Sequence, residues 1–313
     1  MHAARPFEVL LLVDFSDLSL RTAGYVARLA DAVSMRLTLL HVRDGAEPVR
    51  AAQQRLARFV PEADRTCDCE RLVAAGEPLE VLEHYAAREP VDLVLMPAST
   101  SSAFGSLRPA NPSRRLEVLE RLRVPLWTIG PPTDADRLER PIRNVACWLD
   151  LTSRSHPQLS FAAEYARAVN AQLHLLAEVP EPTVPVIRDE TIPLAPAAAA
   201  EWLLSTAAPA LRSPQVWVAE EGSSEQRRKL LRDCAADVLF VPHTERPLLE
   251  WFGARPRWFS EPDCPVVMVP SSPRQQRWHL TSRSTVLPRS EVVLPPRRRA
   301  GSPQGVSAGT PGA

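Results

Sequence analysis

The sequence predicts an α/β protein with two repeated domains, each a doubly wound parallel sheet of about five strands, followed by a disordered C-terminal tail. Strand-length apolar segments alternate with amphipathic helical segments, the whole order occurs twice, and the end of the chain is rich in Pro, Ser and Arg without periodicity. Strand–helix–strand repeats form right-handed crossovers, which make each sheet parallel. We expect domains at 5–130 and 142–270, a proline-bounded linker at 131–141 and the tail at 271–313.

The first expected strand ends in an abrupt change of polarity. In LLLVDFSDLS, residues 10–19, four apolar residues suited to a strand buried on both faces run directly into Asp14. An acid at the carboxyl end of a parallel strand lies where α/β folds bind their ligands. Ser16 and Asp17 fit the start of the next helix, because Ser and Asp cap its free N–H groups. Asp14 fits either role, ligand contact or cap.

The strand, helix and strand of residues 7–42 have a counterpart at residues 142–179. Asp14 aligns with Asp150, so an acid follows the first strand of both copies. Between the strands, small and apolar residues recur at helical spacing. Each helix therefore has one face to lay on a sheet.

The second part of each copy repeats as well. Residues 74–99 match residues 219–244, with Asp92 aligned to Asp237 before the next strand. Each copy then closes with a short strand introduced by proline, VPLWTIG in the first and CPVVMVP in the second. This order completes about five strands per copy.

The two closing strands, residues 126–129 and 266–269, are short and apolar. At the edge of a sheet they would expose unpaired N–H groups, and such edges pair with one another. We therefore expect the two domains to pair within one chain through these strands, with a homodimer as a further possibility. The sequence identifies no other protein partner.

Composition favours a protein of the cytoplasm. With 313 residues, 45% of them hydrophobic, the chain can bury a core in each domain. No apolar run approaches the roughly 20 residues of a membrane span, and the run before Asp14 is too short for a secretory signal. The odd number of cysteines fits a reducing compartment. Cys67 and Cys69 are close, but no second Cys or His pair nearby supports a zinc site.

The formal net charge is zero, yet the charges are unevenly distributed. From Ser271 onward there are seven arginines and one acid. Trp278 is the single aromatic residue among those arginines, which argues against nucleic-acid binding. Lys229 is the only lysine, which excludes most Schiff-base and phosphate-cradling lysine chemistry. We expect residues from about Pro273 to be dispensable for folding, because their composition offers little apolar surface to bury.

The chain resembles the universal stress protein family, in a tandem form with two domains on one chain. The resemblance is carried by VDFSDLSLRTAGYVARLA and GEPLEVLEHYAAREPVDLVLM in the first copy, and by the closing strands VPLWTI and CPVVMV. It extends from about Phe7 to Pro270 and is stronger in the first copy. It implies a doubly wound fold, a role in the stress response and pairing along the last strand.

Members of this family that bind ATP carry a loop G-x-x-G, nine residues, then G-S or G-T after the fourth strand. Glycines there let backbone N–H groups approach phosphate oxygens in front of a helix N-terminus. In the first copy the corresponding positions hold Pro97, Thr100, and either Ala110-Asn111 or Pro112-Ser113. Proline lacks the N–H group and fixes φ, so it cannot replace the first glycine.

The loop of the second copy departs further from the binding pattern. Pro242 and Glu245 stand at its first two glycine positions, and the acid would repel phosphate. In the first copy Arg114 and Arg115 could pair with phosphate oxygens, although two arginines at the start of a helix more often form a solvated surface. No motif glycine is clearly kept in either copy.

The sequence also lacks the common catalytic motifs. G-x-S-x-G, G-x-G-x-x-G and G-x-x-x-x-G-K-S are all absent. His41 and His174 fall inside the second strands, where a histidine is more often a satisfied structural residue than a catalyst. We therefore expect no catalytic residues.

Two hypotheses follow. In the first, the chain is a non-enzymatic stress-response protein without a cofactor, whose tandem domains form an internal pseudo-dimer and act through protein contacts. In the second, it is a sensor whose first domain holds ATP or AMP through Asp14, the backbone near Val42 and a remodelled loop from Met96 to Ser113, with slow hydrolysis. By the resemblance, Asp14 would meet the adenine and ribose end of the nucleotide. The altered loops favour the first hypothesis.

Overall fold

The structure is a computed structural model that describes most of both repeats. The described residues are 5–43, 45–61, 63–97, 112–129, 140–149, 151, 157–178, 200–201, 204, 214–219, 224–243, 264–274, 278 and 280. The greater part of the expected linker and of the expected tail lies outside them.

The first half of the fold follows the strand–helix order that the sequence predicts. Its elements are β1 (Phe7–Leu12), α1 (Asp17–Ala32), β2 (Met35–Arg43), α2 (Val49–Ala57), α3 (Ala63–Thr66), β3 (Asp68–Ala75), α4 (Pro78–Arg88), β4 (Leu93–Pro97), α5 (Pro112–Leu122) and β5 (Leu126–Ile129). The second half repeats the strands with β6 (Asn144–Trp148), α7 (Pro157–Val169), β7 (Gln172–Glu178), β8 (Gln215–Ala219), α9 (Ser224–Asp233), β9 (Val238–His243) and β10 (Val266–Pro270).

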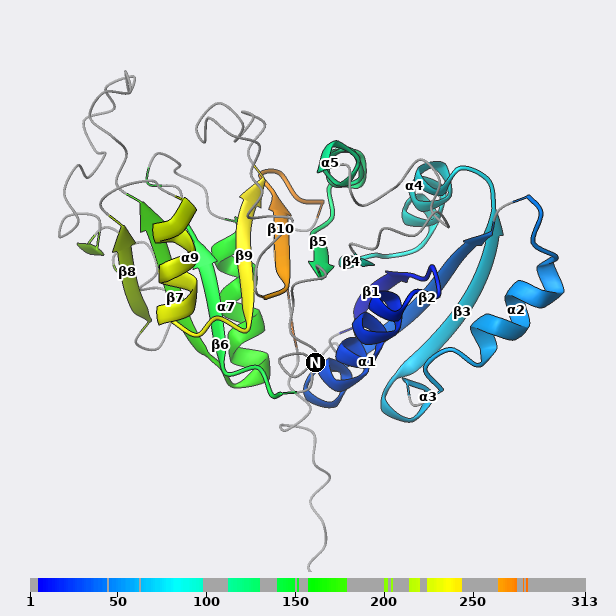
Figure 1. Cartoon of the computed structure of the whole chain (residues 1–313), viewed down its shortest axis with the longest axis horizontal. Coiled ribbons are helices and arrows are strands. Elements are labelled where there is room, and N and C mark those ends of the chain that lie inside the picture. Colours follow the sequence, from blue (N-terminus) through cyan, green and yellow to red (C-terminus); the bar gives the residue numbers. More distant parts are fainter. Residues whose placement is uncertain are drawn as a thin grey trace, which may run out of the picture.

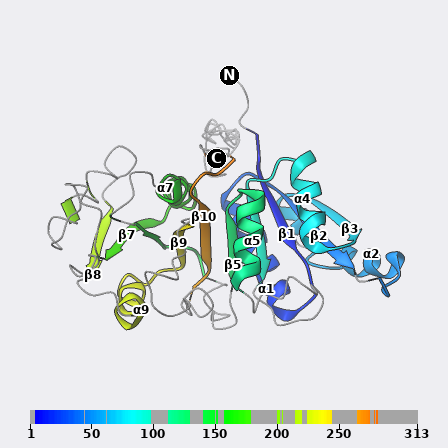
Figure 2. The same ribbon diagram turned by 90° about the horizontal axis from the view of Figure 1, so that it is seen from above.

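All of these strands form one continuous sheet (Figures 1 and 2). Its order is β3-β2-β1-β4-β5-β10-β9-β6-β7-β8, so the second half mirrors the first. Within each half the strands pair in parallel, whereas β5 and β10 pair antiparallel at the centre. The predicted fold class, a doubly wound α/β sheet that occurs twice, is confirmed. The two sheets meet edge to edge at the closing strands β5 and β10.

Burial on both faces explains the apolar run at the start of the chain. Val9 and Leu11 of β1 pack into the core under α1 and α7, whereas Leu10 and Leu12 pack into the core under α4 and α5. Because helices cover both faces of the sheet, successive side chains of a central strand must all be apolar.

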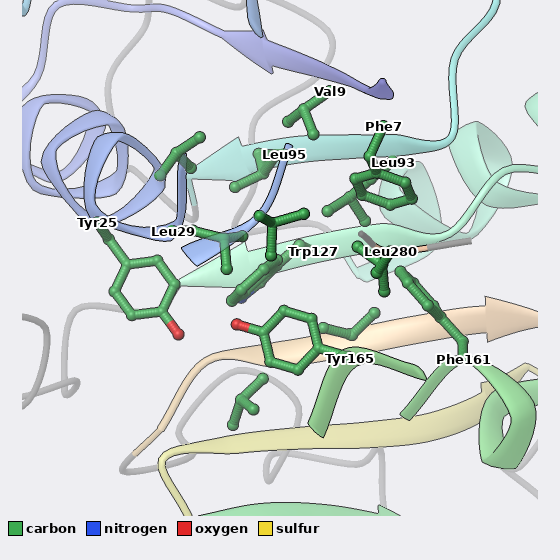
Figure 3. Close-up of a cluster of buried hydrophobic side chains, with 14 of the residues drawn as sticks. Phe7, Val9, Tyr25, Leu29, Leu93, Leu95, Trp127, Phe161, Tyr165 and Leu280 are labelled. Carbon is green, nitrogen blue, oxygen red and sulfur yellow. The ribbon is translucent and has the colours of Figure 1, made fainter. Parts of the chain in front are cut away.

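The contact between the halves is built from aromatic rings that lie on one face of the sheet (Figure 3). Trp127 of β5 makes edge contacts with Tyr25 of α1 and Tyr165 of α7, at ring-centroid distances of 5.2 and 5.7 Å. The two tyrosines occupy matching positions in the two copies, and their hydroxyls point toward one another. Burial raises the pKa of both phenols, so both stay neutral.

The structure describes residues 271–274, 278 and 280, which the sequence assigned to the tail. Trp278 and Leu280 are only 2% and 1% exposed and belong to the core that includes α1 and α7. Burial of these two large apolar side chains favours their packed position, because each removes apolar surface from water. Residues 281–313 lie outside the described part of the chain.

None of the helices in the described part of the chain is long and apolar enough to cross a membrane.

Candidate functional site

The carboxyl ends of β1, β2 and β4 meet at one edge of the first half. These strands are neighbours in the sheet, with Leu12 opposite Leu40 and Leu11 opposite Leu95. Asp14 therefore follows β1 at the level of Val42, with Met96 on the other side of β1. The structure brings these three predicted positions to the edge where α/β folds bind ligands.

Asp14 is buried and holds the turn between β1 and α1. Its Oδ1 accepts hydrogen bonds from the backbone N–H of Ser16 at 3.0 Å and from the Ser16 hydroxyl at 2.6 Å. The Ser16 hydroxyl oxygen in turn accepts from the N–H of Ser19 at 3.1 Å and caps α1. Phe15, between the two, has a φ of 58°, a value uncommon for a side-chain-bearing residue. The carboxylate thus stabilises a tight turn and a helix cap together.

His41 lies beside this turn and is fully hydrogen-bonded. Its Nδ1 is 2.8 Å from the carbonyl oxygen of Val13, and its Nε2 is 2.9 Å from a carboxylate oxygen of Glu47. Both ring nitrogens of His41 thus lie within hydrogen-bond distance of an oxygen acceptor. Arg55 donates to the other Glu47 oxygen and lies over the ring of Phe15. The hydrogen bond from His41 lowers the pKa of the Glu47 carboxyl.

The same edge of the second half carries a buried ion pair. Trp148 lies opposite Leu176 as Leu12 lies opposite Leu40, so Glu178 of β7 occupies the position of Val42. Arg227 of α9 donates two hydrogen bonds to the Glu178 carboxylate, at 2.8 and 3.0 Å.

The partner of Glu178 also replaces an apolar residue of the first half. Arg227 lies ten residues before Asp237, as Leu82 lies ten residues before Asp92. Val42 and Leu82 belong to one buried apolar cluster in the first half, whereas the second half has the ion pair at both positions. The two strand edges have therefore diverged in charge while keeping the same backbone.

His174, the second predicted histidine, is also satisfied within the fold. The indole N–H of Trp217 donates to its Nδ1 at 3.0 Å, and its Nε2 is 3.1 Å from the side-chain oxygen of Asn144. This arrangement requires a neutral ring with its proton on Nε2. Burial lowers the pKa of His174, which favours the same neutral form.

No protein-family model and no curated protein sequence matches the chain. Solved structures do match. A universal stress protein from Archaeoglobus fulgidus DSM 4304 aligns with a TM-score of 0.63 and 14% sequence identity, over 84% of this chain and 98% of that one. A functionally unknown protein from Pseudomonas aeruginosa PAO1 aligns with a TM-score of 0.56 and 16% identity, over 85% of this chain and 92% of its own. A Pseudomonas aeruginosa UCBPP-PA14 protein, provisionally described as a universal stress protein, aligns with a TM-score of 0.54 and 15% identity, over 85% of this chain and 93% of its own.

The chain has the universal stress protein fold. The alignments cover more of the chain than either half alone provides, so the likeness includes the tandem arrangement. At sequence identities of 14% to 16%, this likeness shows a shared fold. The function has to be inferred from the residues at the strand edges.

The loop that binds phosphate in ATP-binding universal stress proteins falls mostly outside the described residues. Pro97 ends β4 and is paired opposite Ile129 of β5, and Ser113 lies in the first turn of α5. The loop positions Thr100, Ala110 and Asn111, the second-copy loop position Glu245 and the strand-end acid Asp150 are not described. Arg114 and Arg115 lie in the first turns of α5.

The five cysteines all lie in the described part of the chain and carry reduced thiols. Cys67 is buried and donates its S–H to the carbonyl oxygen of Ala63, and burial raises the pKa of the Cys69 thiol to about 12. Across the described ranges, no group of three or more His, Cys, Asp or Glu side chains could hold a metal ion. A thiol with a raised pKa is a poor nucleophile and a poor metal ligand.

The sequence analysis missed three residues at these edges, namely Glu47, Glu178 and Arg227. The signal for Arg227 was present, because α9 reads SEQRRKLLRD and puts an arginine where α4 has an apolar position. Glu178 ends its strand as a charged residue in a position where the first copy has valine. A position-by-position comparison of the two copies would have singled out the pair.

Proposed function

We propose that this chain is a tandem universal stress protein that acts in the stress response of the cytoplasm without catalysis and without a bound nucleotide, through contacts with other proteins. The proposal rests on the strand edges, where family relatives that bind nucleotides would place the adenine and ribose. Among the described residues at this edge, Asp14 binds Ser16 in the first half and Glu178 binds Arg227 in the second.

The observation that carries the proposal is the Glu178–Arg227 ion pair. Its arginine side chain is only 4% exposed and its carboxylate 16% exposed. A ligand that displaced the Glu178 carboxylate would remove the charge paired with the nearly buried Arg227 guanidinium, and breaking such a pair costs several kcal/mol. In the first half, Asp14 is already engaged by both donors of Ser16.

The altered loops and the satisfied histidines support the same conclusion. Pro97 supplies no N–H group where a phosphate would need one. His41 and His174 have both ring nitrogens engaged, so neither is available as a general base.

Nucleotide content and thermal stability test the cofactor-free part of the proposal. Freshly purified full-length protein should release no adenine nucleotide on denaturation, as read by absorbance and chromatography. Millimolar ATP, ADP or AMP should leave its melting temperature unchanged. A ligand at a hundredfold excess over Kd would stabilise the folded state by about 2.7 kcal/mol, so a specific site would be visible.

A survival assay tests the role in stress. Cells that lack the chain should survive heat, oxidation or starvation less well than cells that carry it, and the Asp14→Asn variant should restore survival. Equal survival with and without the chain under every stress would overturn the proposal. Rescue by the wild type but not by a folded Asp14→Asn variant would favour a nucleotide-dependent role.

One observation favours the second candidate function, an adenine-nucleotide sensor in the first half. Asp14, Val42 and Met96 converge at one strand edge there, and the apolar Val42 stands where the second half has Glu178. In this alternative ATP or AMP binds through these residues and the loop that ends at Ser113, with slow hydrolysis at most. A melting shift with nucleotide that Asp14→Asn abolishes would support it.

A further inference from the structure

The chain beyond β10 contacts the first half directly. The backbone N–H of Arg274 donates to the carbonyl oxygen of Arg123 at 2.9 Å, and the Arg123 side chain donates to the carbonyl oxygen of Ser272 at 3.0 Å. The Arg274 side chain also donates to the carbonyl oxygen of Ala86, near the end of α4, at 2.9 Å. Three hydrogen bonds therefore tie residues 272–274 to the ends of α4 and α5.

The same segment then contacts the second half. The indole of Trp278 stacks on the ring of Phe161 in α7, with centroids 4.8 Å apart and planes 19° from parallel. Arg167, also on α7, donates to the carbonyl oxygen of Leu280 at 3.3 Å. In Figure 3 Leu280 lies beside Leu93 and Phe161, at the contact between the halves.

The segment thus reaches both halves and both faces of the sheet. Its first contacts are to α4 and the end of α5, whose apolar side chains form one core, and Trp278 belongs to the core on the opposite face. Phe161 itself contacts Phe7 of β1 at a centroid distance of 5.9 Å, so Trp278 is stacked on a residue that already bridges the halves. We call the described residues that follow β10, namely 271–274, 278 and 280, the strap.

The strands alone give the pairing of the halves little specificity. β5 and β10 share only three residue pairs, and both are short apolar strands at equivalent positions of two similar folds. By sheet geometry β5 could equally pair with β5 of a second copy, since each β5 would be the edge strand of its half if β10 did not cover it. The strap distinguishes these arrangements, because it follows β10 of the second half while its residues 272–274 hydrogen-bond to the first half.

We propose that the strap makes the first half pair with the second half of the same chain and prevents β5 from pairing with a second copy of the chain. The strap adds contacts that only a first half paired with a second half can make. Because the two halves belong to one chain, each is present at a high effective concentration near the other. Without the strap, the pairing of two first halves or of two second halves competes with the pairing of a first half and a second half. This inference concerns assembly and does not depend on the proposed function.

Two truncations of the full chain test the proposal. A chain that ends at Leu280 keeps the strap and serves as the matched control, whereas a chain that ends at Pro270 loses it. We expect the control to match the full chain in melting temperature and in mass by light scattering. The chain ending at Pro270 should melt about 10 °C lower and should form dimers and larger species as concentration rises. Equal masses and equal melting temperatures for the two truncations would overturn the proposal.

Point variants of the full chain cover the case in which the shorter truncation fails to fold. Trp278→Ala and Arg274→Ala should raise amide hydrogen exchange in β5 and β10 by more than about tenfold while β1 and β2 remain protected. Arg232→Ala, at an exposed position of α9, is the control and should leave amide hydrogen exchange unchanged in all four strands. A uniform rise over the whole sheet would mean a general core contact and would contradict a strap that acts at the contact between the halves.

Discussion

Trp127 of β5 lies directly opposite Val267 of β10, and this pair is the middle of the antiparallel contact that joins the two halves. Both side chains are buried, at 1% and 0% exposure. The side chains at the contact between the two repeated domains are therefore as buried as those of a protein core.

A charge at this contact should separate or unfold the halves. Val267→Asp would bury an unpaired carboxylate, and we expect a loss of about 3 kcal/mol or more in the free energy of unfolding. Denaturant titration measures this loss in the free energy of unfolding. Val49→Asp, at a position that is 45% exposed, is the control and should change the stability by less than about 0.5 kcal/mol. Near-wild-type stability of Val267→Asp would show that the contact contributes little.

The ion pair of the second half should be replaceable by the apolar pair of the first. Arg227→Leu alone leaves the Glu178 carboxylate without its bidentate partner and should cost about 3–5 kcal/mol. Adding Glu178→Val should recover most of that loss, because Val and Leu are the residues at the matching positions of the first half. A double-mutant cycle from urea titrations measures the coupling. If the two losses simply add, the residues do not act as a pair.

Asp14 should contribute to stability through its hydrogen bonds to Ser16. Asp14→Ala removes the acceptor of two bonds, and we expect the free energy of unfolding to fall by about 1–2 kcal/mol. Asp14→Asn keeps a neutral acceptor and should cost less. Asp31→Asn, at an exposed position of α1, is the control. A ligand-binding residue would instead leave the ligand-free protein unchanged on substitution.

His174 should make stability depend on pH. Burial lowers its pKa from the ordinary value of 6.5, so near and below that pH the unfolded chain binds more protons than the folded one. The contribution of His174 is present above about pH 6.5 and is lost as the pH falls below it. The free energy of unfolding, measured from pH 8 to pH 5, should fall less steeply in His174→Leu than in the wild type. Identical slopes would contradict this assignment.

Local sequence patterns predicted the fold well for particular reasons. The run LLLV could be recognised as a strand covered on both faces because period and polarity are properties of neighbouring residues. Ser16 and Asp17 marked the start of α1 because caps act over three or four residues. The same local evidence could not decide the role of Asp14, because a cap and a ligand contact require the same residue at the same place.

The tail shows where composition fails. A segment rich in Pro, Ser and Arg has, on average, too little apolar surface to form a buried core. Its composition therefore predicted disorder from residue 271 onward. Trp278 and Leu280 depart from that average, and whether they are buried depends on the surface they meet. That surface is formed by α7 and the contact between the halves, which no local pattern describes.

The sequence by itself determined the order of strands and helices, their duplication and the family resemblance, because each of these is written in nearby residues. Only the tertiary structure decided that Glu178 binds Arg227, 49 residues later, and that Trp278 stacks on Phe161. These contacts join segments that the chain brings together only when the sheet forms. The energy of a buried charge or ring depends on its partners in space, and distance along the sequence does not specify them.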